Sequence, residues 1–190
     1  MRNIFDQYSQ PENQLTHSLA CVLHHDRGLL KSFLKTFGPE THPQVKALNV
    51  IEQSLPGTYE NHGGEDEERG LPDAVIFDEK GWALIIESKV SSSLSPSQLR
   101  RHEKTITKCG YQNVSGLTIT VNKPGSAPDH WSSIHWTDVY SWGHQHRGAS
   151  RWARAMVDYF EIAEARMAEI GYLKEGTITE FSGIAFDPYT

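Results

Sequence analysis

Two apolar, β-branched segments joined by a short polar link constrain the fold of this chain more than any other feature. The segments cover residues 71–77 and 82–90, and the link ends in Glu79-Lys80-Gly81. This pattern predicts a β-hairpin. A three-residue loop favours a type I turn followed by a left-handed residue, and glycine adopts that conformation without steric cost. The register of the hairpin is therefore predictable, with Asp78 paired to Trp82.

That register brings three charged residues to one end of the hairpin. Counting back along the strands pairs Val75 with Ile85 and Asp73 with Glu87. Residues that are directly opposite share a face, and Lys89 lies two positions further along on the same face. The sequence therefore predicts that Asp73, Glu87 and Lys89 converge.

Two opposed carboxylates destabilise a sheet unless a cation or a proton compensates them. Hard oxygen ligands without a cysteine or histidine cluster suit Mg²⁺, with Mn²⁺ as a substitute. Lys89 would neutralise part of the charge and orient or deprotonate a water molecule. The alternative is an ordinary ion pair at the end of a strand, and the spacing alone does not separate the two hypotheses.

Glu12 has two interpretations. Ser9 and Glu12 have the spacing of a capping box, which predicts that a helix starts here and continues to about Leu23. Glu12 also shares the apolar stripe of Leu15 and Leu19, so its carboxylate would point inward to the hairpin site. The pattern leaves both interpretations open.

The remaining patterns predict an α/β domain. Helices are expected over 28–37, 93–108 and 151–170, strands over 116–121 and 133–136, and a weakly favoured strand within 45–55. Residues 177–186 alternate like a strand, which indicates either an added edge strand or a domain that has been cut from a longer protein. Because a hairpin lies among helices, the central sheet is expected to be mixed and flanked by helices. One domain over 1–190 is expected.

The predicted helix at 93–108 carries the densest basic segment of an otherwise acidic chain. The chain has 18 basic and 24 acidic residues, a formal net charge of −6, which is unlike most nucleic-acid-binding proteins. A local basic face is still able to bind phosphates. The candidates beside Gln98 are Arg100, Arg101, His102 and Lys104; the alternative is an ordinary solvated face.

Composition indicates a cytoplasmic protein. The chain contains no run of 18 apolar residues, and its first residues lack the apolar stretch of a signal peptide. Cys21 and Cys109 are too few for a disulfide framework and lack the spacing of metal ligands. No membrane partner is expected.

Pro72-Asp73 followed by Glu87-Ser88-Lys89 resembles the signature of the PD-(D/E)xK nuclease superfamily, which includes many restriction endonucleases. The resemblance covers about residues 9–121 and implies a restriction-endonuclease-like core of helix, three strands, helix and strand. The C-terminal helix at 151–170 is then an addition. The segment at 11–16 resembles the first-helix motif of the superfamily, and the segment at 97–102 resembles the glutamine-containing helix of its exonuclease and defence-associated branches, with His102 where a tyrosine often stands.

The resemblance implies Mg²⁺-dependent hydrolysis of phosphodiester bonds in nucleic acid. Asp73, Glu87 and the backbone carbonyl of Ser88 would hold the metal, and Glu12 would complete the site directly or through water. Lys89 would position the attacking water, and Gln98 would orient Lys89 or the phosphate.

The leading hypothesis is a DNA endonuclease. A non-catalytic nucleic-acid-binding or assembly module that retains the fold is the alternative, and a hydrolase of small phosphoesters is a third. The resemblance also suggests a homodimer, and a sensor domain or partner protein, as partners.

Overall fold

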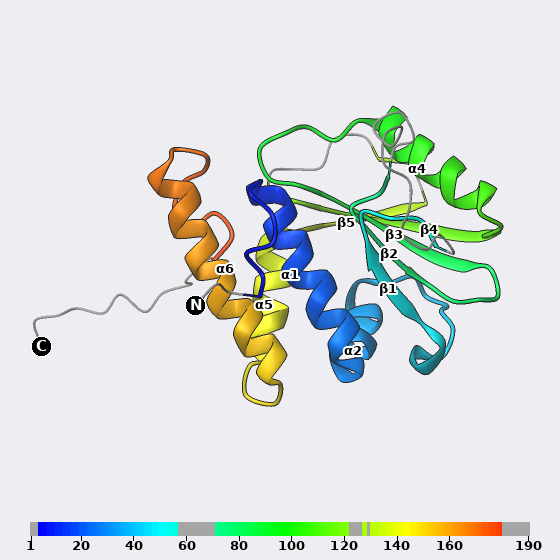
Figure 1. Ribbon diagram of the computed structural model, residues 1–190, viewed down its shortest axis with the longest axis horizontal. Coiled ribbons are helices and arrows are strands. Elements are labelled where there is room, and N and C mark those ends of the chain that lie inside the picture. The colour runs from blue at the N-terminus through cyan, green and yellow to red at the C-terminus, as the bar shows by residue number, and fades with distance from the viewer. Residues whose placement is uncertain (1–3, 57–70, 122–126, 129, 180–190) are drawn as a thin grey trace, which may run out of the picture.

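The structure is a computed structural model that describes residues 4–56, 71–121, 127–128 and 130–179 (Figure 1). Within these ranges the chain forms one five-stranded mixed sheet and five α-helices, so it belongs to the α/β class. The helices are α1 (Pro11–His25), α2 (Arg27–Phe37), α4 (Pro96–Lys108), α5 (Trp136–His146) and α6 (Arg151–Glu169). The strands are β1 (Asn49–Glu52), β2 (Ala74–Phe77), β3 (Trp82–Lys89), β4 (Asn113–Thr120) and β5 (Trp131–His135).

The strands lie in the order β1-β2-β3-β4-β5. The first three are antiparallel neighbours, whereas β3, β4 and β5 are parallel to one another. The mixed sheet expected from the sequence is confirmed. A parallel neighbour requires a crossover, and α4 supplies it between β3 and β4.

Helices cover both faces of the sheet (Figure 1). The larger core packs α1, α2, α5 and α6 against one face, where Ile76, Leu84 and Ile86 point. The smaller core packs α4 against the other face, where Val75 and Ile85 point. Alternation along β3 thus directs neighbouring side chains toward different helices.

Several predicted boundaries differ from the structure. Gln10, rather than Ser9, occupies the N-cap position of α1, and no side chain forms a capping hydrogen bond with the first turn. The predicted strand at 133–136 is β5, but it begins at Trp131 and ends before Trp136. Trp136 opens α5, a helix that was not among the predicted elements. The carboxylate of Asp138 accepts a 2.7 Å hydrogen bond from the backbone N–H of His135, which favours the helix at this point.

The remaining predicted elements agree closely, apart from the C-terminal strand. The ambiguous segment at 45–55 contains β1, preceded by a short 3₁₀ turn at Val45–Ala47. Residues 177–179 do not form a strand; instead, the backbone N–H groups of Ile178 and Thr179 donate to the buried Glu164 carboxylate. The rest of the predicted strand, 180–186, lies outside the described residues. In the part of the chain that is described, no helix has the length and apolar character needed to cross a bilayer.

Candidate active site

The hairpin of β2 and β3 has the predicted register. Val75 is paired with Ile85 and Ala74 with Ile86, so Asp73 and Glu87 occupy the next position along the ribbon. Gly81 has a φ of +98°, as the left-handed turn position requires. Local turn chemistry therefore brings together Asp73 and Glu87, which are 14 residues apart in the sequence.

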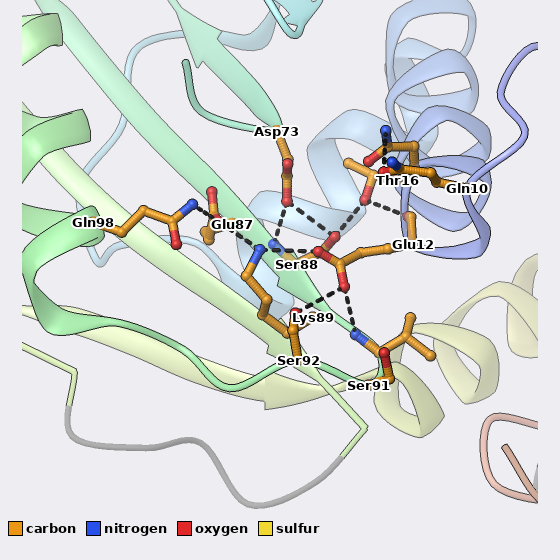
Figure 2. A network of polar contacts seen from close by, with 12 residues as sticks. Gln10, Glu12, Thr16, Asp73, Glu87, Ser88, Lys89, Ser91, Ser92 and Gln98 are labelled. Carbon is orange, nitrogen blue, oxygen red and sulfur yellow. Dashed lines mark hydrogen bonds and ion pairs between the residues drawn. The ribbon is translucent and has the colours of Figure 1, made fainter. Parts of the chain in front are cut away.

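Lys89 joins two carboxylates that come from different elements (Figure 2). Its Nζ atom donates to Glu87 Oε1 at 2.8 Å and to Glu12 Oε1 at 2.9 Å. The side chain of Glu87 is 0% exposed, that of Lys89 11% and that of Glu12 17%. The Lys89 ammonium group thus links the first turn of α1 to the end of β3.

Among the described residues, three donors hold the carboxylate of Glu12. Besides Lys89, the backbone N–H of Val90 donates to Oε2 at 3.1 Å and the Ser92 hydroxyl donates to the same oxygen at 3.3 Å. These contacts resolve the two interpretations of Glu12: its carboxylate points to the hairpin, not back to Ser9, and the capping box does not form. It contacts the lysine rather than Asp73.

The helix α4 supplies two further contacts of Glu87. Gln98 Nε2 donates to Oε1 at 2.8 Å, and His102 Nε2 lies 3.2 Å from Oε2. Gln98 and His102 are four residues apart, so both lie on the inner face of the helix. His102 is 1% exposed. Its prediction as part of an exposed nucleic-acid-binding face is wrong, because helical periodicity turns it inward toward Glu87.

Asp73 is held by hydrogen bonds from Ser88 in β3 and from Gln53, the residue that follows β1. Its Oδ2 atom accepts from the Ser88 backbone N–H at 2.7 Å and from the Ser88 hydroxyl at 3.1 Å, and Ser88 also shares a 2.6 Å hydrogen bond with Thr16 of α1. Its carbonyl accepts a 3.1 Å hydrogen bond from Gln53, whose φ of +42° is unusual for a residue other than glycine. Strained backbone of this kind is concentrated at functional sites.

The cluster contains more negative than positive charge. Burial, and then the charge of Glu87, raise the pKa of Asp73 to about 7, although Lys89 and the Ser88 N–H partly offset them. Burial also opposes ionisation of Glu87, but the contact with His102 and the charge of Lys89 outweigh it and lower its pKa. Burial opposes the charge of Lys89 as well, but Glu87 and Asp73 raise its pKa above the ordinary value. Lys89 is therefore an ammonium ion at neutral pH.

The donor chemistry suits a hard cation, although not as a cage of side chains. Asp73, with a pKa near neutrality, is a carboxylate that lacks a sufficient counter-charge, and carboxylate oxygens are the ligands that Mg²⁺ prefers. Among the described residues, however, no group of three or more His, Cys, Asp or Glu side chains is arranged to hold a metal ion. Mg²⁺ commonly binds through one or two carboxylates and water. Asp73 and Glu87 fit that smaller set.

The outer face of α4 remains basic. Arg100, Arg101 and Lys104 are all exposed, as a phosphate-binding surface requires. With His102 turned inward, the exposed basic face is smaller than predicted.

Four contributors to the site were not identified from the sequence: Thr16, Gln53, the Ser88 side chain and Ser92. Thr16 lies four residues after Glu12, and this helical spacing was the available signal. Ser88 and Ser92 are unremarkable in sequence, and the strained Gln53 carries no signal. Comparison of the chain with protein-family models, curated proteins and solved structures gives no significant match. Functional interpretation therefore rests on the geometry of the site.

Proposed function

We propose that the protein is a metal-dependent nuclease with a restriction-endonuclease-like core that hydrolyses phosphodiester bonds in DNA. The observation that carries the proposal is the convergence of Asp73, Glu87 and Lys89 at the end of one hairpin, with Glu87 fully buried. A structural protein gains little from such a cluster, because desolvating charges costs more than a surface ion pair returns. The order of helix, three strands, helix and strand supports the same superfamily resemblance.

Asp73 and Glu87, with the backbone carbonyl of Ser88, would hold one Mg²⁺ or Mn²⁺ ion. A divalent cation there would offset negative charge on a phosphate and lower the pKa of water. Asp73 directly precedes β2 and Glu87 lies in the neighbouring strand β3, and hydrogen bonds from Ser88 and from α4 hold them, so they need no rearrangement of the backbone to act together.

The chain's own residues supply positioning and charge. Lys89 acts as a hydrogen-bond donor toward the phosphate rather than as a base, because its neighbours keep it protonated. Gln98 orients Glu87 through its amide hydrogen bond. Glu12 acts through Lys89, the residue that it contacts, and the metal-ligand role suggested by the resemblance would require its carboxylate to change partners.

Exposed Arg100, Arg101 and Lys104 place positive charge on α4, the helix that also carries Gln98. Neutralising backbone phosphates with such residues releases counterions and makes binding dependent on salt. We expect this face to hold the duplex on either side of the bond that is cut.

Cleavage assays test this function directly. Supercoiled plasmid, single-stranded DNA and RNA are incubated with the chain in Mg²⁺, Mn²⁺ or EDTA, with Lys89→Ala as the inactivating variant. Lys80→Ala serves as the matched control, because Lys80 is exposed at the other end of the hairpin. We expect cleavage that needs metal and Lys89 but not Lys80. Cleavage by Lys89→Ala at the wild-type rate would contradict the proposal.

One observation favours the alternative of a non-catalytic binding module. The described residues contain no three-ligand cluster of side chains for a metal, and Lys89 already balances Glu87 and Glu12. Nucleic-acid binding that is equal with and without metal, and is never followed by cleavage, would establish that alternative.

A further inference from the structure

Three donors beside the candidate active site converge on a single anionic group. The Lys89 ammonium, the Val90 backbone N–H and the Ser92 hydroxyl come from four consecutive positions of the chain, and all donate to the carboxylate of Glu12. That carboxylate belongs to a different element, the first turn of α1 (Figure 2). The donors and the anion that they bind are thus supplied by separate parts of the fold.

This set of donors has the chemistry of a phosphate site. Charge-assisted hydrogen bonds from an ammonium, combined with a backbone N–H and a hydroxyl, are the contacts that proteins use to hold phosphate oxygens. Carboxylate and phosphate oxygens accept the same donors, so one group is able to replace the other. Ser92 is exposed to solvent and the side chain of Glu12 is 17% exposed, which gives a ligand access to the donors.

The donors are held in place by more than Glu12. Lys89 also donates to Glu87 at 2.8 Å, and the carbonyl of Lys89 accepts a hydrogen bond from the backbone N–H of Val121. The backbone that carries the donors therefore keeps its anchor to β3 and β4 when the Glu12 side chain rotates away. A phosphate and the Glu12 carboxylate, by contrast, cannot use the same donors together, because like charges at this separation repel strongly.

We infer that Lys89, Val90 and Ser92 form a binding site for one phosphate group, and that Glu12 occupies it as an internal anion until the phosphate displaces it. The inference deepens the proposed function, and it rests on that function only for the source of the phosphate, which is a nucleic-acid chain. Glu12 is then an autoinhibitory contact, and its displacement releases Lys89 toward the substrate.

The test is binding of inorganic phosphate to the whole chain in EDTA, measured by isothermal titration calorimetry. Glu12→Gln keeps the size of the side chain and removes its charge, so we expect phosphate to bind at least tenfold more tightly than to the wild type. Glu161→Gln is the control for net charge, since Glu161 lies on α6 and accepts from Tyr140. Adding Ser92→Ala to Glu12→Gln is expected to weaken phosphate binding again by several-fold.

A second variant distinguishes the absence of a phosphate site from a folding defect. Glu12→Ala is measured alongside Glu12→Gln, with circular dichroism to verify that both variants are folded. If folded variants bind phosphate no more tightly than Glu161→Gln does, the inference is wrong. The measurement uses neither metal nor cleavage, so an inactive protein with an intact phosphate site would overturn only the proposed nuclease.

The source of the phosphate is tested with oligonucleotides under the same conditions. A short DNA strand with a 5′-phosphate is compared with the same strand ending in a 5′-hydroxyl. Equal gains in affinity on Glu12→Gln indicate that an internal phosphodiester is bound, and a gain confined to the phosphorylated strand indicates a terminal phosphate. A gain with inorganic phosphate alone would overturn the assignment to a nucleic-acid chain.

Discussion

Replacement of Lys89 by methionine tests the electrostatic account of the site without any substrate. Methionine retains most of the aliphatic stem, so the change removes mainly the charge and its hydrogen bonds to Glu87 and Glu12. Removing one partner of a buried ion pair typically costs about 3–5 kcal/mol, because it leaves an uncompensated charge. Since Glu87 is fully buried, we expect a loss of unfolding free energy within that range at pH 8.

We expect a loss of unfolding free energy near the lower end of this range, about 3 kcal/mol. Gln98 still donates to Glu87 in the variant, and Glu12 is partly exposed, so neither carboxylate loses every stabilising contact. A loss of about 3 kcal/mol in a chain of this length lowers the melting temperature by roughly 6–12 °C. Urea denaturation gives the free energy, and calorimetry gives the melting temperature.

The pH dependence of this loss has a definite sign. The lowered pKa of Glu87 contributes stability that is present above its ordinary pKa and is lost as the pH falls through the folded-state value. Without Lys89 that contribution is much reduced, and the variant relieves its excess charge by binding protons. The difference in unfolding free energy between wild type and Lys89→Met should therefore be smaller at pH 5 than at pH 8.

A double variant separates the charge from the packing. Glu87→Gln combined with Lys89→Met removes both charges, and we expect it to recover most of the stability that Lys89→Met loses. Lys80→Met is the control for the loss of an exposed lysine. The reasoning would be refuted by a loss below about 1 kcal/mol for Lys89→Met at pH 8, or by a double variant that is no more stable than the single one.

Two further predictions concern the scaffold. A Cβ atom at Gly116 in β4 would lie 1.9 Å from the ring of Trp131, so Gly116→Ala should lower the free energy of unfolding in chemical denaturation by about 1–3 kcal/mol. Gly148→Ala is the control, because a Cβ atom at Gly148 meets no neighbour, and it should leave the free energy of unfolding unchanged. Equal losses for the two variants would contradict the packing argument. The hydrogen bond to Glu52 raises the pKa of His17 despite its burial, so the stability that protonated His17 contributes is complete below about pH 6.5 and is lost as the pH rises through its folded-state pKa. The advantage of the wild type over His17→Gln in unfolding free energy should accordingly be larger at pH 6 than at pH 9, and a constant difference would show that the charge of His17 plays no part.

The hairpin was predictable because its determinants are local. The left-handed Gly81 and the alternation of side chains fix the register, and the register alone places Asp73 beside Glu87. The mixed sheet and the helix at 151–170 were predictable for the same reason. Strong periodicity over a long segment leaves few alternatives.

The position of Glu12 was not predictable, because its partners are distant in sequence. Its spacing from Ser9 satisfied a capping box, and the apolar stripe satisfied an inward position. The choice depends on Lys89, which lies 77 residues away, and on the backbone of Val90. The contact with Lys89 joins two full and opposite charges, whereas a bond to the backbone of the first helical turn would involve the charge of Glu12 alone.

Two errors arose from grouping residues by local composition. Trp136 continued the strand-forming composition of 133–135, but its spacing to Val139 and Tyr140 is helical, and all three residues are buried in the larger core. His102 was grouped with its basic neighbours by composition, although its spacing from Gln98 already indicated the inner face of α4. In both cases helical periodicity was the better guide.

The arrangement of β3 explains why the charged cluster forms where it does. β2 pairs with β3 only as far as Ile86, whereas β4 continues alongside β3 to Lys89. Residues 87–89 therefore extend past the antiparallel ladder, and alternation directs Ser88 to α1 and Glu87 to α4. Two helices on opposite faces of the sheet thus converge on three consecutive residues. The resulting site holds three carboxylates near one ammonium, so a ligand that brings positive charge relieves an imbalance that the fold itself maintains.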